Sequence, residues 1–548
     1  MAQVPFRGNT QGMTFPLLST KVGMTVINPG PDQTYAPQVS TDGAIPIDRG
    51  VASAVYAHNV MPSINGWRSV GYQNFLVPPD AAATDPTINF DRCFYVQGAK
   101  LGDPPEDENG DDEEDKRRPE AIDARVYIAL GRDGGSNAIF RTNDLNKWYP
   151  IANGQPAIPD NCEMTTAEVN GVTYIYFSYV GCYIYDPDSD TLIERELKGL
   201  DKESILGIVS SAGYLMAYTS TAYSWSSAVD VEDFDPEGGD ISGAGGGQVQ
   251  EAKGPIVCAR PTFLGVLLFT TANAISVTFS GNENFPWNFK AIPSAGGISN
   301  TDMVGKSELG TFYYAFTTAG MQQITHSRAT TVLATVTDFF GEQVFEDFDS
   351  ETNTFTRLPV TWPMRKKVAT VADRYLIISY GYSPNEEMTH AVIMDMSQNR
   401  MGKLKCPHNY VFERVPTNNE QAEIPKESIV LLSKNGSAKV VDFSEAANVT
   451  DAVLFLGRFQ LVRQRFVQLQ EIFCTSMAPG DASQLVAIPT LDGFTEEDPQ
   501  YGYVGTDAGN GLKRYLFPAL VGKNFSLILK GKFDLFSYEM WLTPHGRF

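Results

Sequence analysis

The stretch MTTAEVNGVTYIYFSYVGCYIYDPDSDTLIEREL, residues 164–197, contains two consecutive hairpin patterns. Its first two runs flank Asn170-Gly171, a dipeptide suited to the positive φ angles of a two-residue hairpin turn. The next two runs, "GCYIYDP" and "LIEREL", flank a second turn at "DSD". Aromatic and β-branched residues fill these runs and are enriched in strands. The stretch therefore predicts short antiparallel strands that follow one another along the chain.

The same pattern continues on both sides of this stretch. Further hairpins are predicted around Ala212-Gly213, Ala272-Asn273, Ala319-Gly320 and Lys434-Asn435-Gly436. Turn signals about 8–12 residues apart are typical of an all-β sandwich, barrel or propeller. The hairpins come in groups of about four strands separated by longer loops, as in the blades of a propeller. We therefore expect an all-β chain with a β-propeller body over residues 76–450, whose blade count the inexact repeats do not give.

The two ends of the chain differ from this body. Residues 1–75 contain few long β runs and much Pro, Gly and Asn, whereas 452–473 and 524–548 predict longer strands. We expect the terminal segments, 1–75 and 451–548, to pack into one β-rich platform domain. The C-terminal part also has a basic character, carried by Arg458, Arg463, Arg465, Lys530 and Lys532.

Composition limits the function classes. The chain has 65 acidic and 42 basic residues, a formal net charge of −23. Binding to the phosphates of nucleic acid requires Lys and Arg, so this balance argues against a protein that grips nucleic acid. The N-terminus lacks the apolar core of a signal peptide, and the uncharged stretch 261–282 contains too many polar residues for a membrane helix.

The cysteines and histidines do not predict a metal site. The six cysteines form no C-x-x-C pair, and we expect them to be reduced core residues. Cys406 and His408 form an isolated C-P-H triplet, which is weak evidence for a metal ligand pair. We expect no metal ion and no cofactor.

An acidic segment, residues 102–120, contains ten acids and three bases. Such a composition cannot bury apolar surface and predicts a solvated loop. Calcium binding is the functional alternative, but the segment lacks the spacing of an EF-hand loop.

A second acidic region, TAYSWSSAVDVEDFDPEGGDISGAGGGQVQ (221–250), is the strongest candidate for chemistry. A glycosidase needs two carboxylates about 5–10 Å apart in different environments. The acids Asp230, Glu232, Asp233 and Asp235 share one turn-rich loop, and we expect them to be solvated. The glycine run 243–248 lacks the Lys and the following helix of a phosphate loop and is expected to be a flexible connection. No other catalytic motif occurs, so we expect no catalytic residues and no enzyme.

Several segments, taken in order, resemble one family of virion proteins. They are AHNVMPSINGWRSVGYQNF (57–75), the Tyr-Ser-Trp run and acid-Phe turn of 221–250, the hairpin 264–299 with Phe285-Pro286-Trp287, "GTFYYAFTTAGMQQI", and "LFLGRFQLVRQR" near the C-terminus. Together they are similar to the tail nozzle (tail tube terminal, or packaged-DNA stabilisation) proteins of short-tailed phages, the podoviruses. The resemblance covers most of residues 45–548 and is one of order and residue type; the acidic segment 102–120 has no counterpart in it.

The resemblance implies a structural role in the virion. A β-propeller body and a platform would form a homo-oligomeric ring, a hexamer, below the tail adaptor protein, with fibres or spikes attached. Double-stranded DNA would pass along the ring axis without sequence-specific contact. An acidic wall suits such a conduit because it repels DNA over about 8–10 Å, whereas a basic wall would bind it. The alternative is a β-propeller tail protein that binds or hydrolyses glycan, and assembly into a closed ring separates the two.

Overall fold

The computed structural model describes the larger part of the chain: residues 4–9, 24–27, 38–40, 56–63, 66–74, 89–102, 117–133, 136–143, 148–160, 162–237, 243–282, 286–305, 310–332, 340, 344–349, 354–359, 365–371, 374–381, 383, 386–397, 400–414, 428–442, 448–449, 451–461, 466–476, 483–490 and 501–544. Within these ranges the regular elements are β-strands and one three-residue 3-10 turn, η3 (Thr301–Met303). The prediction of an all-β chain is confirmed.

Seven antiparallel groups of three or four strands, the blades of a propeller-like ring, account for most of the described strands. Six of these blades are separate sheets, and blade six is one end of an eleven-stranded sheet. Blades one to four each contain four strands in chain order. Blade one comprises β8 (Asn89–Leu101), β9 (Pro119–Asp133), β10 (Ser136–Thr142) and β11 (Tyr149–Pro150). Blade two comprises β12 (Met164–Val169), β13 (Val172–Phe177), β14 (Gly181–Asp186) and β15 (Thr191–Arg195). Blade three comprises β16 (Gly207–Ser211), β17 (Tyr214–Tyr218), β18 (Ala222–Trp225) and β19 (Gly245–Gln248). Blade four comprises β20 (Ile256–Thr262), β21 (Gly265–Thr270), β22 (Ala274–Phe279) and β23 (Trp287–Ala291).

The remaining three blades close the ring. Blade five comprises β24 (Phe312–Thr317), β25 (Gly320–Thr325) and β26 (Ala329–Thr331). Blade six comprises β29 (Arg365–Val371), β30 (Tyr375–Gly381), β31 (Met388–Asp395) and β32 (Arg400–His408). Blade seven comprises β33 (Tyr410–Arg414), β34 (Ser428–Leu432), β35 (Ala438–Asp442) and, from the N-terminal part of the chain, β7 (Gly71–Asn74). A separate hairpin is formed by β27 (Val344–Asp349) and β28 (Thr354–Pro359).

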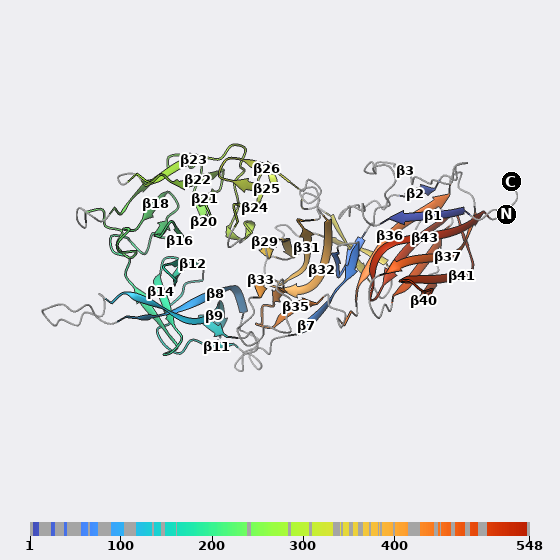
Figure 1. Ribbon diagram of the computed structural model, residues 1–548, viewed down its shortest axis with the longest axis horizontal. Coiled ribbons are helices and arrows are strands. Elements are labelled where there is room, and N and C mark those ends of the chain that lie inside the picture. The colour runs from blue at the N-terminus through green and yellow to red at the C-terminus, as the bar shows by residue number, and fades with distance from the viewer. Residues whose placement is uncertain are drawn as a thin grey trace.

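The first strand of each blade faces the middle of the ring. β12 packs against β16, β29 against β33, and β33 against β8, so the circle closes between blades seven and one (Figure 1). The second strands β13, β21 and β30 are buried along their whole length, because each is covered on both faces by neighbouring blades. Their near-continuous apolar sequences follow from this double burial.

The hairpin turns that were predicted from sequence are confirmed at several blades. Asn170 and Gly171 have φ angles of 52° and 81°, and Ala212 and Gly213 have φ angles of 51° and 84°. Two successive positive φ angles are the requirement of a type I′ turn, whose twist matches that of the flanking strands. Thr271–Asn273 connects β21 to β22, in the uncharged stretch that was too polar for a membrane helix. In the described residues no helix is long and apolar enough to cross a membrane.

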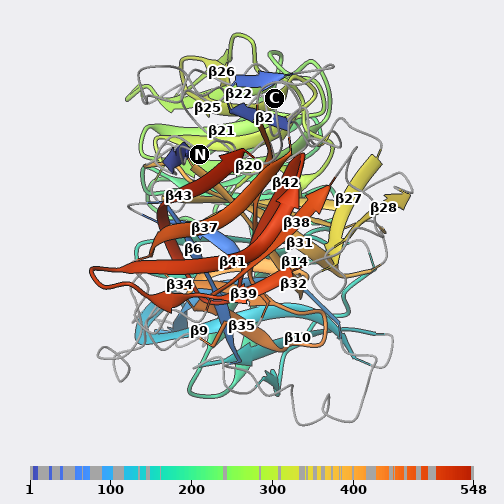
Figure 2. The ribbon, with the colours of Figure 1, turned by 90° about the vertical axis from the view of Figure 1, so that its right-hand side faces the viewer.

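A second unit is built from both ends of the chain, and we call it the terminal unit (Figures 1 and 2). Its first set of strands contains β1 (Val4–Asn9), β43 (Asp534–Pro544), β37 (Val467–Ser476), β41 (Leu512–Gly522) and β40 (Thr506–Asp507). These strands are continuous with blade six in one eleven-stranded sheet. Its second sheet contains β3 (Gln38–Ser40), β2 (Met24–Ile27), β36 (Val453–Leu461), β42 (Asn524–Lys530), β38 (Gln484–Thr490) and β39 (Tyr501–Val504), with β4 (Tyr56–His58) also on β36. Alternate side chains of the two sheets, among them Leu454, Leu469 and Leu527, share one buried core.

Residues 56–74 connect the two units, and we call them the seam. β4 pairs with β36 of the terminal unit, and β5 (Val60–Pro62) pairs with β32 of blade six. β6 (Trp67–Ser69) pairs with β43 of the terminal unit, and β7 completes blade seven. The chain thus alternates between the units strand by strand. The boundary expected at residue 75 differs from this sheet membership, because β7 belongs to a blade of the ring.

Candidate functional site

The described residues contain no cluster of three or more His, Cys, Asp or Glu side chains that could hold a metal ion. All six cysteines are free thiols, and five of them, including Cys406, are buried. His408 is also fully buried: its Nδ1 donates to the Cys406 carbonyl and its Nε2 lies 2.7 Å from Ser379 Oγ. Burial lowers the pKa of His408 to about 4, so the imidazole is neutral near pH 7. The C-P-H triplet is a hydrogen-bonded core element in this structure.

The acidic region 221–250 forms the outer edge of blade three. β18 and β19 pair through Trp225 and Gly245, and the acids lie in the loop between them. The glycine run was expected to be a flexible connection, which is wrong, since Gly245–Gln248 is an edge strand. The absence of side chains permits the close approach, because a Cβ on Gly245 would lie 2.7 Å from the indole of Trp225.

Glu232 corrects a second expectation about this loop. Its carboxylate is buried against Arg195 at the end of β15, with Nε–Oε1 and Nη2–Oε2 distances of 2.8 and 2.6 Å. Bidentate Arg–carboxylate geometry gives short, charge-assisted hydrogen bonds. Asp230, Asp233 and Asp235 instead accept hydrogen bonds from backbone N–H groups two residues ahead, the turn role predicted for them. Among the contacts that the structure describes in this loop, the ion pair of Glu232 with Arg195 connects blade three to blade two.

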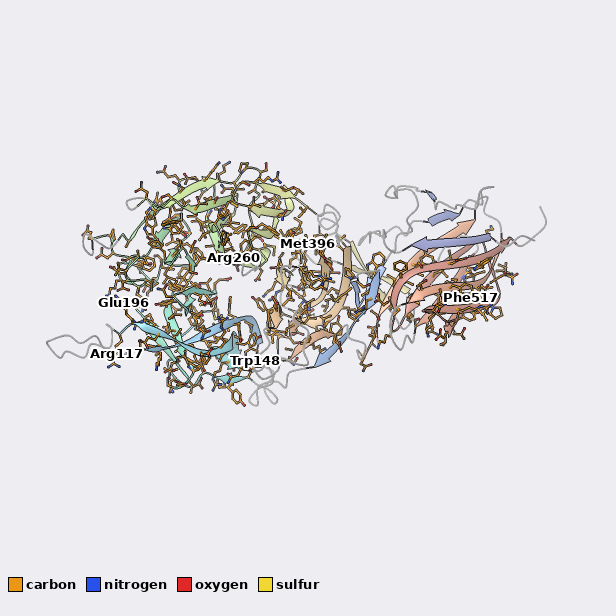
Figure 3. The ribbon with its side chains drawn as sticks, in the orientation of Figure 1. Arg117, Trp148, Glu196, Arg260, Met396 and Phe517 are labelled. Carbon is orange, nitrogen blue, oxygen red and sulfur yellow. The ribbon has the colours of Figure 1, made fainter. Side chains whose placement is uncertain are left out.

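Arg195 also fixes an extension of blade one. β8 and β9 pair as far as Leu101 and Pro119, beyond the other blades, and Gly98 of this extension packs on Pro187 of blade two. Arg195 Nη2 donates to the Arg117 carbonyl oxygen at 3.0 Å. Arg117 lies at the base of the loop between β8 and β9 (Figure 3). Most of the acidic segment predicted at 102–120 follows from this base, and residues 103–116 lie outside the described ranges.

A second polar cluster lies within the ring around η3. Thr301 Oγ1 donates to Glu163 Oε2 before β12, and Arg260 Nη2 of β20 donates to the Thr301 carbonyl. Asp302 lies 3.7 Å from Lys367 Nζ of β29. The Thr301 side chain, the Thr301 carbonyl and the Asp302 side chain therefore contact blades two, four and six respectively. Arg260 faces the middle of the ring (Figure 3), and these contacts connect blades to one another.

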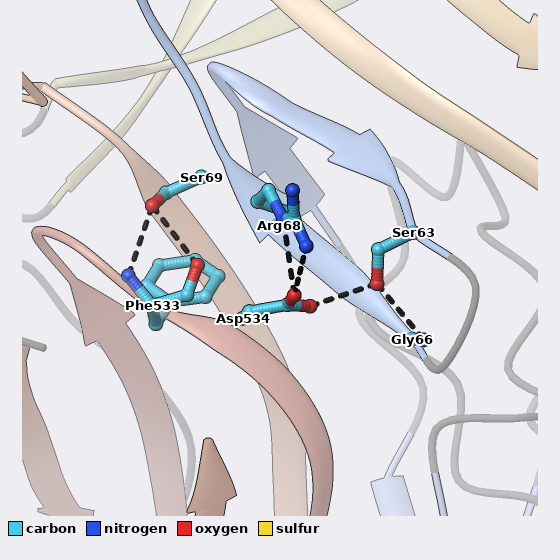
Figure 4. Close-up of polar contacts among 6 residues, drawn as sticks. All are labelled: Ser63, Gly66, Arg68, Ser69, Phe533 and Asp534. Carbon is cyan, nitrogen blue, oxygen red and sulfur yellow. Dashed lines mark hydrogen bonds and ion pairs between the residues drawn. The ribbon is translucent and has the colours of Figure 1, made fainter. Parts of the chain in front are cut away.

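Polar side chains of the seam bond to the terminal unit around Asp534 and Phe533 (Figure 4). Arg68 Nη2 lies 2.7 Å from Asp534 Oδ2, and Ser63 Oγ donates to Asp534 Oδ1 at 2.8 Å. Asp534 is buried while Arg68 is partly exposed, so the ion pair has one side in water. Ser69 bonds the Phe533 backbone through both its hydroxyl and its own N–H. These contacts join residues more than 460 positions apart in the chain.

Asn59 makes the second group of seam contacts. It has a φ angle of 52°, a left-handed conformation that Asn tolerates better than most residues. Its Nδ2 donates to the Asp451 carbonyl at 2.7 Å, while its Oδ1 accepts from Tyr72 Oη and from the Lys405 backbone N–H. One buried amide thereby connects the terminal unit, blade six and the strand that closes blade seven.

Two more residues show how closely the units approach. The Trp67 ring is fully buried in the core of the terminal unit, and its Nε1 donates to the Met401 carbonyl of blade six at 3.0 Å. A Cβ on Gly402 would lie 2.2 Å from the Val60 carbonyl oxygen, so only glycine permits β5 to pair there. His58 Nε2 lies 3.0 Å from Asp451, and burial lowers its pKa more than this carboxylate raises it.

The basic residues singled out in the C-terminal part are only partly described. Arg458 lies in β36, paired with Ser526 of β42, and Lys530 ends β42. Arg463 and Arg465 fall outside the described ranges. The sequence does not single out Asn59 and Arg68 of the seam or their neighbour Asp534 of β43, although Asn59 and Arg68 lie in the segment 57–75 that carries part of the family resemblance. The local sequence signals in the seam are Asn59 before β5 and the glycines just before β6 and at the start of β7. These signals predict turns, but they do not indicate which distant strands pair with the seam.

Comparison with known proteins adds little. No protein-family model and no curated protein matches the chain. Among solved structures, the chain is similar to cobalt-substituted apocarotenoid oxygenase (ACO) of Synechocystis, with 11% identity, a TM-score of 0.27, and coverage of 70% of this chain and 93% of that chain. It is also similar to AztD of Citrobacter koseri, with 10% identity, a TM-score of 0.27, and coverage of 70% and 96%. The N-terminal domain of Nup159 has 8% identity and a TM-score of 0.24, with coverage of 70% and 98%. Scores this low carry no argument about function.

Proposed function

We propose that this protein is a structural component of a short-tailed phage virion. In this proposal it forms the tail nozzle, a ring of about six copies below the adaptor protein. The ring retains the packaged genome and guides it outward at infection. The protein acts without catalysis, and its partners are its own copies, the adaptor, attached fibres or spikes, and the passing DNA.

The observation that carries the proposal is the family resemblance of residues 57–75 together with their place in the fold. These residues include most of the seam, which alternates between two units and closes the last blade. The segment that carries the resemblance also pairs with strands of both units. This position supports a structural role for the protein. In the proposal, the terminal unit is the platform that docks on the adaptor.

The charge of the chain supports a conduit in particular. Each chain carries a net charge of −23, so a ring of several copies would hold a large excess of negative charge. A wall of the same sign as DNA lets the duplex slide, because no counterions are released by contact. Repulsion reaches about 8–10 Å at physiological salt, so it acts only in a bore slightly wider than DNA.

The arrangement of Glu232 also favours a non-catalytic role over glycan hydrolysis. A glycosidase acid needs a raised pKa and access to the substrate. Glu232, the buried acid of the 230–235 loop, is bound on both oxygens by Arg195. Both oxygens of this buried carboxylate accept hydrogen bonds from Arg195, so neither is presented to a substrate.

Native mass measurement of the purified full-length chain tests the proposal. We expect a closed assembly of about six times the 60.1 kDa of one chain, with no larger open polymers. Polysaccharide, peptidoglycan and nucleic acid should remain intact in its presence. A stable monomer or trimer that turns over a glycan would contradict the proposal and favour the glycan-active alternative.

A further inference from the structure

Blade four projects two apolar side chains into solvent at one turn. The turn joins β20 to β21, and its two residues are Phe263, which is 85% exposed, and Leu264, which is 55% exposed. Phe263 is the most exposed large apolar side chain in the described part of the chain. A single exposed Leu needs no explanation, but adjacent Phe and Leu at the end of a projecting hairpin do.

The turn is held in place by hydrogen bonds on both sides. Thr262 Oγ1 donates to the Gly265 carbonyl and accepts from the Leu264 backbone N–H. Thr262 Oγ1 also bonds His326 Nε2 of blade five, whose Nδ1 lies 2.6 Å from Ser276 Oγ. The apolar pair is therefore presented by a rigid base.

Glycine at position 265 completes this base. Its φ angle is 149°, and an added Cβ would lie 2.1 Å from the Val277 carbonyl oxygen. Tyr313 of blade five donates its hydroxyl proton to the Pro261 carbonyl. Ordering a turn this strongly costs conformational entropy, and the exposed Phe263 and Leu264 add no packing within the chain to offset it. A partner that contacts the turn would meet it already ordered.

The apolar surface continues from the turn onto the blade. Phe279, at the end of the neighbouring strand β22, is 46% exposed. Its ring centroid lies 6.0 Å from Tyr214 and 5.3 Å from Trp287. Turns after the first and third strands of a blade emerge on the same face, because successive strands are antiparallel. Phe263, Leu264 and Phe279 thus form one patch, which we call the blade-four tip.

The chemistry of the blade-four tip favours a lipid interface over a glycan or a protein pocket. No charged residue occurs from Pro261 to Asn282, so the turn and the strand ends that carry the tip bring no charge of their own into the interface. Glycan binding needs free hydrogen-bonding groups, and the Thr262 hydroxyl is already used. Protein interfaces surround an apolar centre with a polar rim, whereas Phe and Leu on a projecting surface are typical of segments that enter the headgroup region.

We propose that the blade-four tip inserts into an uncharged or zwitterionic lipid surface. Phe263 and Leu264 would enter the interface, with Phe279 at its edge. The net charge of −23 opposes binding to anionic lipids, so phosphatidylcholine is the favoured surface. The contact is weak for one chain, because even a myristoyl group gives an association constant of only about 10⁴ M⁻¹. The proposal does not depend on the nozzle function.

Flotation of the full-length chain with phosphatidylcholine vesicles tests this, at about 10 mM lipid to suit a weak contact. We expect the chain to float, and Phe263→Ser/Leu264→Ser to reduce its partition coefficient about tenfold or more. The matched control is Val504→Ser, which removes an apolar side chain that is 73% exposed on the terminal unit. This control should float like the unmodified chain.

A second readout covers the case in which the double variant does not fold. Brominated phosphatidylcholine should quench the added fluorescence of Phe263→Trp more strongly than that of Val504→Trp. Failure of the unmodified chain to float, or equal quenching of the two tryptophan variants, would overturn the proposal. Flotation only with anionic vesicles, lost on adding salt, would overturn it too, as would binding of the tip to a purified protein without any binding to vesicles.

Discussion

The propeller ring and the terminal unit are both antiparallel β structures, yet the chain builds them in opposite ways. Within a blade such as β12–β15, each strand pairs with the next one in sequence. In the terminal unit, β36 pairs with β4 and β43 pairs with β1, from opposite ends of the chain. The ring is therefore a series of local structures, and the terminal unit is a product of long-range pairing.

This difference has consequences for folding. Contacts between residues that are far apart in sequence form slowly, because the intervening chain must be ordered first. The seam is made early in synthesis, but its partners β32, β35 and β43 come hundreds of residues later. Blades one to six can form before the seam docks, whereas blade seven and the terminal unit cannot. Matched substitutions in the ring and in the seam can therefore separate local from long-range stabilisation.

The largest effect is expected from two buried tryptophans. Trp67 lies in the seam and Trp148 lies between blades one and seven, where its Nε1 donates to the Gly436 carbonyl at 2.9 Å. Each replacement by Ala should cost about 3–5 kcal/mol of unfolding free energy, through lost burial and the cavity left behind. In differential scanning calorimetry, Trp67→Ala should lower the melting temperature of the terminal unit. Trp148→Ala should lower the melting temperature of the ring. Equal shifts of one shared transition would show that the two units unfold together.

The next effect concerns the buried ion pair of blades two and three. Glu232→Ala leaves the Arg195 guanidinium buried without its carboxylate, which should cost about 3 kcal/mol. Glu237→Ala, on an exposed side chain of the same loop, should change stability by less than about 0.5 kcal/mol. Urea denaturation measures both, and limited proteolysis should cut Glu232→Ala faster near Arg117, whose carbonyl Arg195 binds. If the two variants have similar unfolding free energies, Glu232 contributes no more than a solvated acid, as the sequence predicts.

A smaller effect separates two asparagines with the same backbone angle. Asn59 in the seam and Asn170 in a blade hairpin both have a φ angle of 52°. Glycine accepts this conformation, so replacement isolates the side chain. Asn59→Gly removes three hydrogen bonds, to Asp451, to Lys405 of blade six and to Tyr72 of β7, and should cost about 2 kcal/mol. Asn170→Gly, on an exposed side chain, should cost less than about 0.5 kcal/mol. Chemical denaturation measures the unfolding free energy of both variants. An equal loss in the two would show that the hydrogen bonds of Asn59 do not stabilise the seam.

The smallest effect is a pH dependence located in the ring. His408 has a folded pKa of about 4 against an ordinary value of 6.5, so the unfolded chain binds a proton first as pH falls. Stability is then lost between about pH 6.5 and 4, with about 1 kcal/mol lost from pH 7 to 5.5. His408→Asn should remove that part of the slope in thermal unfolding curves. An unchanged slope would mean that other groups, such as the buried His58, dominate the pH response.

The comparison also explains what could be predicted from the sequence. The Asn170-Gly171 and Ala212-Gly213 turns were predictable because the signal and the structure lie within a few residues. The same holds for the all-β class and for the grouping of strands by four. Blade closure by β7 was not predictable in this way, since the sequence of Gly71–Asn74 does not indicate that its partner is β35.

Individual side chains show the same limit. Asp230, Asp233 and Asp235 act within their own loop and were interpreted correctly as turn acids. Glu232 looks like them in sequence, but its environment is set by Arg195 from another blade, 37 residues earlier. Asp534 likewise gains its role from Ser63 and Arg68. A residue whose surroundings come from distant strands cannot be assigned from local composition.

Cryo-electron microscopy of the assembly that this protein forms, isolated from its native source, tests the nozzle proposal most directly. The account predicts a closed ring of about six copies on the tail axis, with the terminal units toward the adaptor and a channel as wide as DNA through the middle. A map that instead shows single chains or trimers at the tail periphery, with no axial channel, would contradict the nozzle proposal and favour a glycan-binding role.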